Sequence, residues 1–131
     1  MILVDSSVWI AALRRKESQE ARHLVELLDE DQVALASPVR LELLAGASAA
    51  DLPRVRRALS ALPLLVPGSQ TWTRAESWIK VATAAGERFG VVDLLIGALA
   101  TEREAALWSL DSDYARMSRL GLVKLHQPPA N

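Results

Sequence analysis

The sequence predicts a single α/β domain in which helices cover both faces of a central parallel sheet. Short apolar runs alternate with longer segments whose apolar residues recur at helical spacing. Such alternation favours parallel strands joined by right-handed helical crossovers. A chain of 131 residues, half of them hydrophobic, suits one domain with a proper core. We expect this domain to span residues 1–126, with residues 127–131 as a frayed tail.

Composition excludes several classes of protein. The chain has no cysteine, which rules out disulfides and thiolate zinc sites. No apolar run approaches the ~20 residues that span a bilayer, and the opening MILVD does not resemble a signal peptide, so we expect a cytoplasmic protein without membrane contact. A net charge of −1 argues against coating of nucleic acid by a broadly basic surface. Glycine-rich nucleotide-binding motifs are also missing from the sequence.

The first part of the chain reads as two strand–helix units. A β-rich run ends at Asp5, where a helix begins, and leucines recur at helical spacing between Ser18 and Asp31. A second apolar run precedes Ser37 and Pro38, which suggest an N-cap followed by proline at the first helical position. The predicted elements are strands over residues 2–4 and 33–36 and helices over residues 6–13, 18–31 and from 38 onward.

The remainder repeats the alternation with longer helices. Asp51 is the expected cap of a helix that runs to about residue 62. Gly90 interrupts a long helical pattern, and Gly121 ends the last helix. The predicted elements are helices over residues 51–62, 71–89, 92–104 and 111–120, with strands over residues 64–66, 107–110 and 122–125.

Two carboxylates lie just beyond predicted strands. Asp5 follows the first strand, and Asp111 follows the strand over residues 107–110. Residues past the carboxyl ends of parallel strands line a common crevice, so Asp5 and Asp111 face each other if their strands are neighbours. Each could equally be a helix N-cap, and Asp113 a first-turn acid favoured by the helix dipole.

Glu42 and Asp93 interrupt apolar helical runs. Asp93 lies between Val-Val and Leu-Leu-Ile, and each acid has a glycine four residues later, Gly46 or Gly97. Small residues leave room for an ion, whereas helix–helix packing would explain the glycines but not the acids. Converging carboxylates stay ionised together only around a cation, and oxygen-only ligation selects Mg²⁺ or Mn²⁺. The sequence therefore predicts a metal site and phosphate chemistry.

Histidine-dependent hydrolysis is disfavoured by the same sequence. Only His23 and His126 are present, and both are expected at the surface rather than as ligands or bases. Trp9 and Trp108 lie within apolar runs and are expected in the core.

Four ordered stretches resemble the PIN-domain family, most closely the VapC-type toxins of prokaryotic toxin–antitoxin pairs: ILVDSSVWI, VRLELLAG, VVDLLIGALA and SLDSDY. The resemblance implies a small α/β/α sandwich and a Mg²⁺-dependent endoribonuclease, with Mn²⁺ as a possible substitute. It places the catalytic acids at Asp5, Glu42, Asp93 and Asp111, with the metal on Asp5, Asp93 and Asp111. Glu42 is either a further ligand or the base that activates water. Orienting roles fall to Ser7, to Ser109, where the family usually has threonine, and to the additional acid Asp113.

The resemblance also implies partners: an RNA substrate, a cognate antitoxin and a second copy in a homodimer. Two alternatives remain open, a non-catalytic PIN-like scaffold that binds RNA or protein, and a Mg²⁺-dependent phosphatase. The phosphatase is less favoured because its Asp-x-Asp motif is absent where Asp5 is followed by Ser6 and Ser7.

Overall fold

A computed structural model describes residues 1–129 and contains a four-stranded parallel sheet. The strand order is β3-β2-β1-β4, and the first and last strands along the chain pair through Leu3 and Leu107. This arrangement confirms the predicted parallel α/β fold. The strands are β1 (Ile2–Val4), β2 (Val33–Ala36), β3 (Leu64–Leu65) and β4 (Ala106–Trp108).

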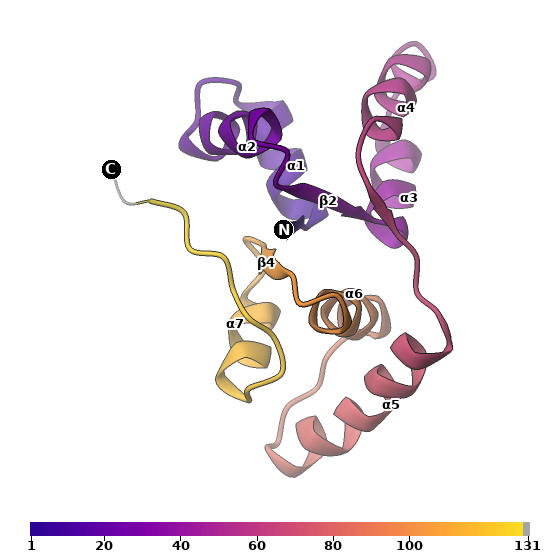
Figure 1. Cartoon of the computed structure of the whole chain (residues 1–131), viewed down its shortest axis with the longest axis vertical. Coiled ribbons are helices and arrows are strands. Elements are labelled where there is room, and N and C mark those ends of the chain that lie inside the picture. The colour runs from indigo at the N-terminus through magenta and orange to yellow at the C-terminus, as the bar shows by residue number, and fades with distance from the viewer. Residues whose placement is uncertain (130–131) are drawn as a thin grey trace.

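Helices cover the sheet on both faces (Figure 1). The chain advances from β1 through β2 to β3 and then returns to place β4 on the other side of β1. Right-handed crossovers that run in opposite directions lie on opposite faces, so α1 and α2 lie on one face and α5 and α6 on the other. The helices are α1 (Ser6–Arg14), α2 (Gln19–Asp29), α3 (Ser37–Gly46), α4 (Leu52–Ser60), α5 (Ser69–Ala84), α6 (Val91–Glu102) and α7 (Ser112–Arg119).

The core fills both faces of the sheet, under α1 and α2 on one face and under α5 and α6 on the other. Strands β1 and β2 are buried on both faces, as expected for the centre of a parallel sheet. Helix α6 is buried from Leu94 to Ala100, so only its two ends reach the surface. Trp9 and Trp108 are buried as predicted, at 8% and 3% exposure. Within residues 1–129, no helix has the length and apolar character needed to cross a membrane.

Several predicted boundaries were wrong for local reasons. Ser37 is the first residue of α3 rather than its cap, since Ala36 holds the capping position without a side-chain bond. Helix α5 ends at Ala84, before the predicted end, because Gly86 adopts φ +73° and the Glu87 amide donates to the Ala82 carbonyl at 2.8 Å.

The C-terminal segment follows β4 without forming the predicted strand. A single bridge joins Leu107 and Leu125, and the His126 amide donates to the Leu107 carbonyl at 2.8 Å. This path carries His126 to His23 on α2, and their Nε2 atoms lie 2.8 Å apart. Both histidines are half-buried, so they lie at the surface with only part of each ring exposed. Of the predicted tail, residues 130 and 131 lie outside the described part of the chain.

Candidate metal centre

Asp5 is fixed at the end of β1 by two serine hydroxyls. Its side chain caps α1 and is 6% exposed. Ser7 Oγ and Ser109 Oγ each donate to Asp5 Oδ2 at 2.8 Å, and the Ser7 amide lies 3.4 Å from the same oxygen. Capping and site formation are therefore compatible roles for this residue.

The serines also join β1 to the segment after β4. The Leu110 amide donates to Ser7 Oγ at 3.0 Å, and the Asp111 amide donates to Ser109 Oγ at 3.0 Å. Each hydroxyl thus gives its one proton to Asp5 and accepts from a backbone amide. Asp111 in turn caps α7 by accepting from the Asp113 amide at 2.9 Å. The structure brings Asp5 and Asp111 to the same edge of the sheet, because β1 and β4 are neighbours.

Three acids form a close group at this edge. Asp93, Asp111 and Asp113 each offer a carboxylate oxygen within 4.8 Å of the others. Asp93 lies in the first turn of α6 and accepts from the Tyr114 hydroxyl at 3.3 Å. Burial, followed by repulsion from Asp111, raises the pKa of Asp93 to about 6. Burial and the nearby charge of Asp5 likewise raise the pKa of the Tyr114 hydroxyl.

Asp113 already has a cationic partner. Arg116 donates to both Asp113 and Glu87, and its guanidinium lies over the Phe89 ring at 5.1 Å from the centroid. The bonds to Asp113 and Glu87 raise the pKa of Arg116. Sequence reasoning missed Arg116, although its spacing of three residues from Asp113 on a helix was a usable signal.

Glu42 lies on α3, near Asp5 and Ser6, on the exposed side of the site. Ser6 Oγ donates to Glu42 Oε2 at 3.5 Å, and the pKa of Glu42 is raised by partial burial and then by Asp5. The apolar neighbour Leu41 is 69% exposed, so this side of α3 faces solvent rather than core. Glu42 is therefore less enclosed than its apolar sequence context suggested.

Gly97 does not make room for an ion as expected. A Cβ on Gly97 would lie 3.1–3.2 Å from Val123, Met117 and Trp78, which identifies close helix packing as its role. A Cβ on Gly46 would meet nothing within 4 Å. The packing alternative was the right one for Gly97.

The donor set fits a hard divalent cation. Every candidate ligand is a carboxylate oxygen, the preferred donor of Mg²⁺ and Mn²⁺. The pKa of Asp93 is raised by burial and then by like-charge repulsion from Asp111, and a bound cation would relieve that repulsion. The arrangement can thus hold a metal ion at an open edge of the sheet.

Sequence comparison identifies the family. The PIN domain model matches residues 2–120, nearly the whole chain. The chain belongs to the PIN domain family. The family predicted from the four acidic stretches is therefore confirmed.

Curated relatives of this PIN domain come from mycobacteria. Ribonuclease VapC18 of Mycobacterium tuberculosis is 32% identical over 89% of this chain and 87% of its own length. VapC ribonuclease Mb1587 of Mycobacterium bovis is 31% identical over 92% of this chain and 93% of its own length.

Solved structures share the fold at lower identity. The VapBC2 complex of Rickettsia felis, bound to a promoter DNA fragment, aligns with a TM-score of 0.79 and 19% identity over 96% of this chain and 98% of the matched chain. VapC20 of Mycobacterium tuberculosis, described as a Sarcin-Ricin loop cleaving toxin, aligns with a TM-score of 0.64 and 18% identity over 97% of this chain and all of its own. These matches support the PIN fold of the chain.

Proposed function

We propose that this PIN domain protein is a Mg²⁺-dependent endoribonuclease, with Mn²⁺ as a possible substitute, that acts as the toxin of a type II toxin–antitoxin system. The observation that carries the proposal is the close group of Asp93, Asp111 and Asp113 at the edge of the sheet where Asp5 ends β1. Burial, followed by repulsion from Asp111, raises the pKa of Asp93 there. The names of the mycobacterial relatives, both ribonucleases, support the choice of RNA as substrate.

Asp5, Asp93 and Asp111 are the proposed metal ligands. Ser7 and Ser109 both bond Oδ2 of Asp5, which leaves Oδ1 as the atom to face a cation. Asp113 takes an orienting role, because Arg116 already offsets its charge. In this scheme the two serines fix the Asp5 carboxylate before any ion arrives.

The chemistry requires in-line attack of water on phosphorus. A divalent cation held by these acids would supply Lewis-acid chemistry, polarising the scissile phosphate and lowering the pKa of the attacking water. Glu42, at the exposed side, either completes the ligand set or takes the proton from that water. The water oxygen bonds to phosphorus, the bond to the 3′-oxygen breaks, and the departing 3′-oxygen takes up a proton from bulk water. The products are a 5′-phosphate and a 3′-hydroxyl.

Protein partners are part of the same proposal. The matched solved structures include toxin–antitoxin complexes, and this chain has an apolar groove of about 510 Å³ between α3 and α5. Leu41 and Trp72 line this groove, at 69% and 54% exposure. We propose that the protein binds a cognate antitoxin and forms a homodimer. We propose further that it acts in the cytoplasm, where the RNA substrate is found.

The decisive test is cleavage of structured RNAs by purified protein, with and without Mg²⁺, followed by mapping of the cut ends. Asp5→Asn and Asp93→Asn should abolish cleavage and leave the fold intact, whereas the exposed Asp29→Asn on α2 should cut normally. Wild-type-like cleavage by both site variants would overturn the assignment. A calorimetric titration without Mg²⁺ or Mn²⁺ binding would favour the non-catalytic scaffold, and harmless expression in cells would remove the toxin role.

A further inference from the structure

One buried hydroxyl lies against the acidic group without being needed for packing. Tyr114, in the first turn of α7, is 1% exposed and is among the largest fully buried side chains of the described residues. Its hydroxyl donates to Asp93 Oδ1 at 3.3 Å. A phenyl ring would fill the same space, and a hydroxyl that is taken out of water is costly unless it is bonded. Packing alone therefore does not account for this hydroxyl.

Tyr114 keeps its proton and so acts as a donor. Burial, followed by the charges of Asp5 and Asp93, raises the pKa of its hydroxyl. A neutral phenol has one proton to donate, and the structure directs that proton to Asp93. The bond joins α6 to α7 across 21 residues of sequence, so it fixes where Asp93 lies relative to Asp111, the cap of α7.

Each of the three proposed metal ligands then has one carboxylate oxygen held by a hydrogen bond. Serine hydroxyls hold Oδ2 of Asp5, a backbone amide holds Oδ1 of Asp111, and the tyrosine hydroxyl holds Oδ1 of Asp93. The second oxygen of each carboxylate is left to face a cation. Mg²⁺ favours octahedral coordination by oxygen and keeps several of its waters. Three single oxygens supply half of such a shell and leave the rest for water and a phosphate.

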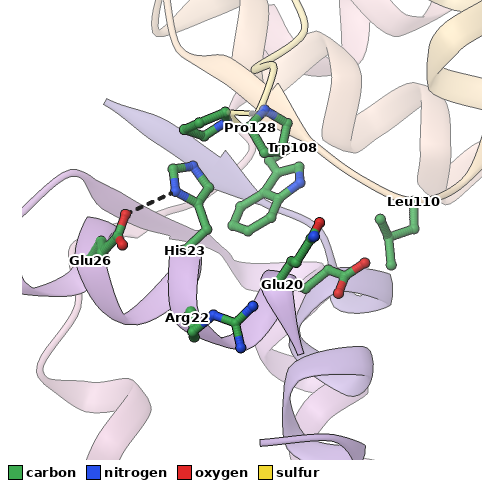
Figure 2. Close-up of a pocket in the computed structure, with 9 residues that line it drawn as sticks. Glu20, Arg22, His23, Glu26, Trp108, Leu110 and Pro128 are labelled. Atoms are coloured by element: carbon green, nitrogen blue, oxygen red, sulfur yellow. Dashed lines mark hydrogen bonds and ion pairs between the residues drawn. The ribbon is translucent and has the colours of Figure 1, made fainter. Parts of the chain in front are cut away.

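Side-chain alternation at the end of β4 serves the same arrangement. Trp108 and Leu110 line a cavity of about 210 Å³ beside α2 (Figure 2), whereas Ser109 between them reaches Asp5. Successive side chains of an extended segment point to opposite faces, so the two apolar residues turn away from the acids. The acids are thus met by one hydroxyl from the end of β4 and by another, that of Tyr114, from α7.

We propose that Tyr114 is a positioning residue for metal binding, whose hydroxyl fixes the Asp93 carboxylate so that Oδ2 faces the cation. The inference rests on the proposed metal-dependent nuclease function. Ser7 and Ser109 act in the same way on Asp5, so hydroxyl groups hold two of the three ligands in place before an ion binds. Loss of such a supporting partner lowers metal affinity by about 10–100-fold in known metal sites.

Calorimetric titration of the metal-free full chain, with Mg²⁺ and separately with Mn²⁺, tests the proposal. Tyr114→Phe keeps the ring and loses only the hydroxyl, and it should raise the dissociation constant of the cation by about tenfold. Thr101→Val is the matched control, because Thr101 Oγ1, about 12 Å further along α6 than Asp93, donates to the Leu122 carbonyl at 2.8 Å. This variant also loses one hydroxyl bond of α6 and should bind the cation as wild type does.

Cleavage kinetics give the second readout. At limiting Mg²⁺, Tyr114→Phe should cut RNA about tenfold more slowly than wild type, and saturating Mg²⁺ should restore most of the rate. A hydroxyl with a merely structural role would lower the unfolding midpoint and leave the dissociation constant unchanged.

The outcomes separate this proposal from the nuclease assignment. Wild-type cation affinity in Tyr114→Phe, or equal weakening in Thr101→Val, would overturn the positioning role while RNA cleavage by the wild type upholds the nuclease. Weaker cation binding by Tyr114→Phe, in a protein whose wild type cuts no RNA, would refute the nuclease and uphold the positioning role. A wild type that binds neither cation would overturn both.

Discussion

Replacing Asp93 by asparagine should stabilise the metal-free protein. The carboxylate is partly buried beside Asp111 and Asp113, and burial together with their charges raises its pKa from 3.8 to about 6. Asparagine has nearly the same shape, keeps an oxygen for the Tyr114 hydroxyl and carries no charge. The substitution removes the repulsion and the cost of burying an ion.

The magnitude follows from the pKa shift. A raised pKa of about two units corresponds to about 3 kcal/mol of destabilisation when the group is ionised. Solvent screening of this half-exposed group, and the loss of a favourable charge at the start of α6, reduce the expected gain to about 1 kcal/mol. The unfolding midpoint should rise by roughly 3–5 °C.

The pH dependence of the stability difference tests whether ionised Asp93 destabilises the folded protein. A carboxyl group with a raised pKa binds a proton more readily in the folded state, so its destabilising effect is absent well below its unfolded pKa of 3.8 and grows until pH reaches about 6. The stability difference between Asp93→Asn and wild type, measured by denaturant unfolding with a chelator, should be near zero at about pH 3 and should level off at its largest value above about pH 6–7. A variant that is less stable than wild type at neutral pH, or a difference that does not change with pH, would refute the repulsion argument.

Three further predictions concern the same edge of the sheet and its packing. Ser109→Ala should weaken Mg²⁺ binding and cleavage by about 10–100-fold, because the Asp5 carboxylate loses a hydrogen bond that fixes it. Ser109→Thr keeps the hydroxyl and should retain activity. Equal losses in both variants would contradict this role of Ser109. Gly97→Ala should lower the free energy of unfolding by about 1–3 kcal/mol through overpacking. Gly46→Ala, in open space on α3, should raise the free energy of unfolding by about 0.5–1 kcal/mol. Chemical denaturation of both variants measures these changes. The rate of cleavage at limiting Mg²⁺ should fall as pH drops through about 6, because protonated Asp93 no longer binds a cation. Saturating Mg²⁺ should move the midpoint of this pH profile to a lower pH. A rate that rises on acidification would exclude Asp93 as a ligand.

Local pattern and one rule of sheet geometry were enough to predict much of this fold and site. Alternation of apolar runs and helical spacing predicted the parallel sheet, and the meeting of strand ends predicted that Asp5 and Asp111 share an edge. Both inferences need only neighbouring residues and the handedness of crossovers.

Long-range pairs were beyond the same reasoning. Glu87 reaches Arg116, and His23 reaches His126, across sequence separations of 29 and 103 residues. Nothing local marks such partners. Gly97 was misread for a related reason, since its contacts with Trp78 and Val123 come from different parts of the chain.

The pairing of β1 with β4 has a consequence for synthesis. Leu3 of β1 pairs with Leu107 of β4. The four-stranded sheet is therefore complete only after most of the chain has left the ribosome. Such distant contacts carry a large loop-closure cost and form late in folding. A nascent or truncated chain that ends before β4 has Asp5 without Ser109 and without Asp111, so the proposed metal site is incomplete. The proposed nuclease would therefore become active only after β4 has paired with β1.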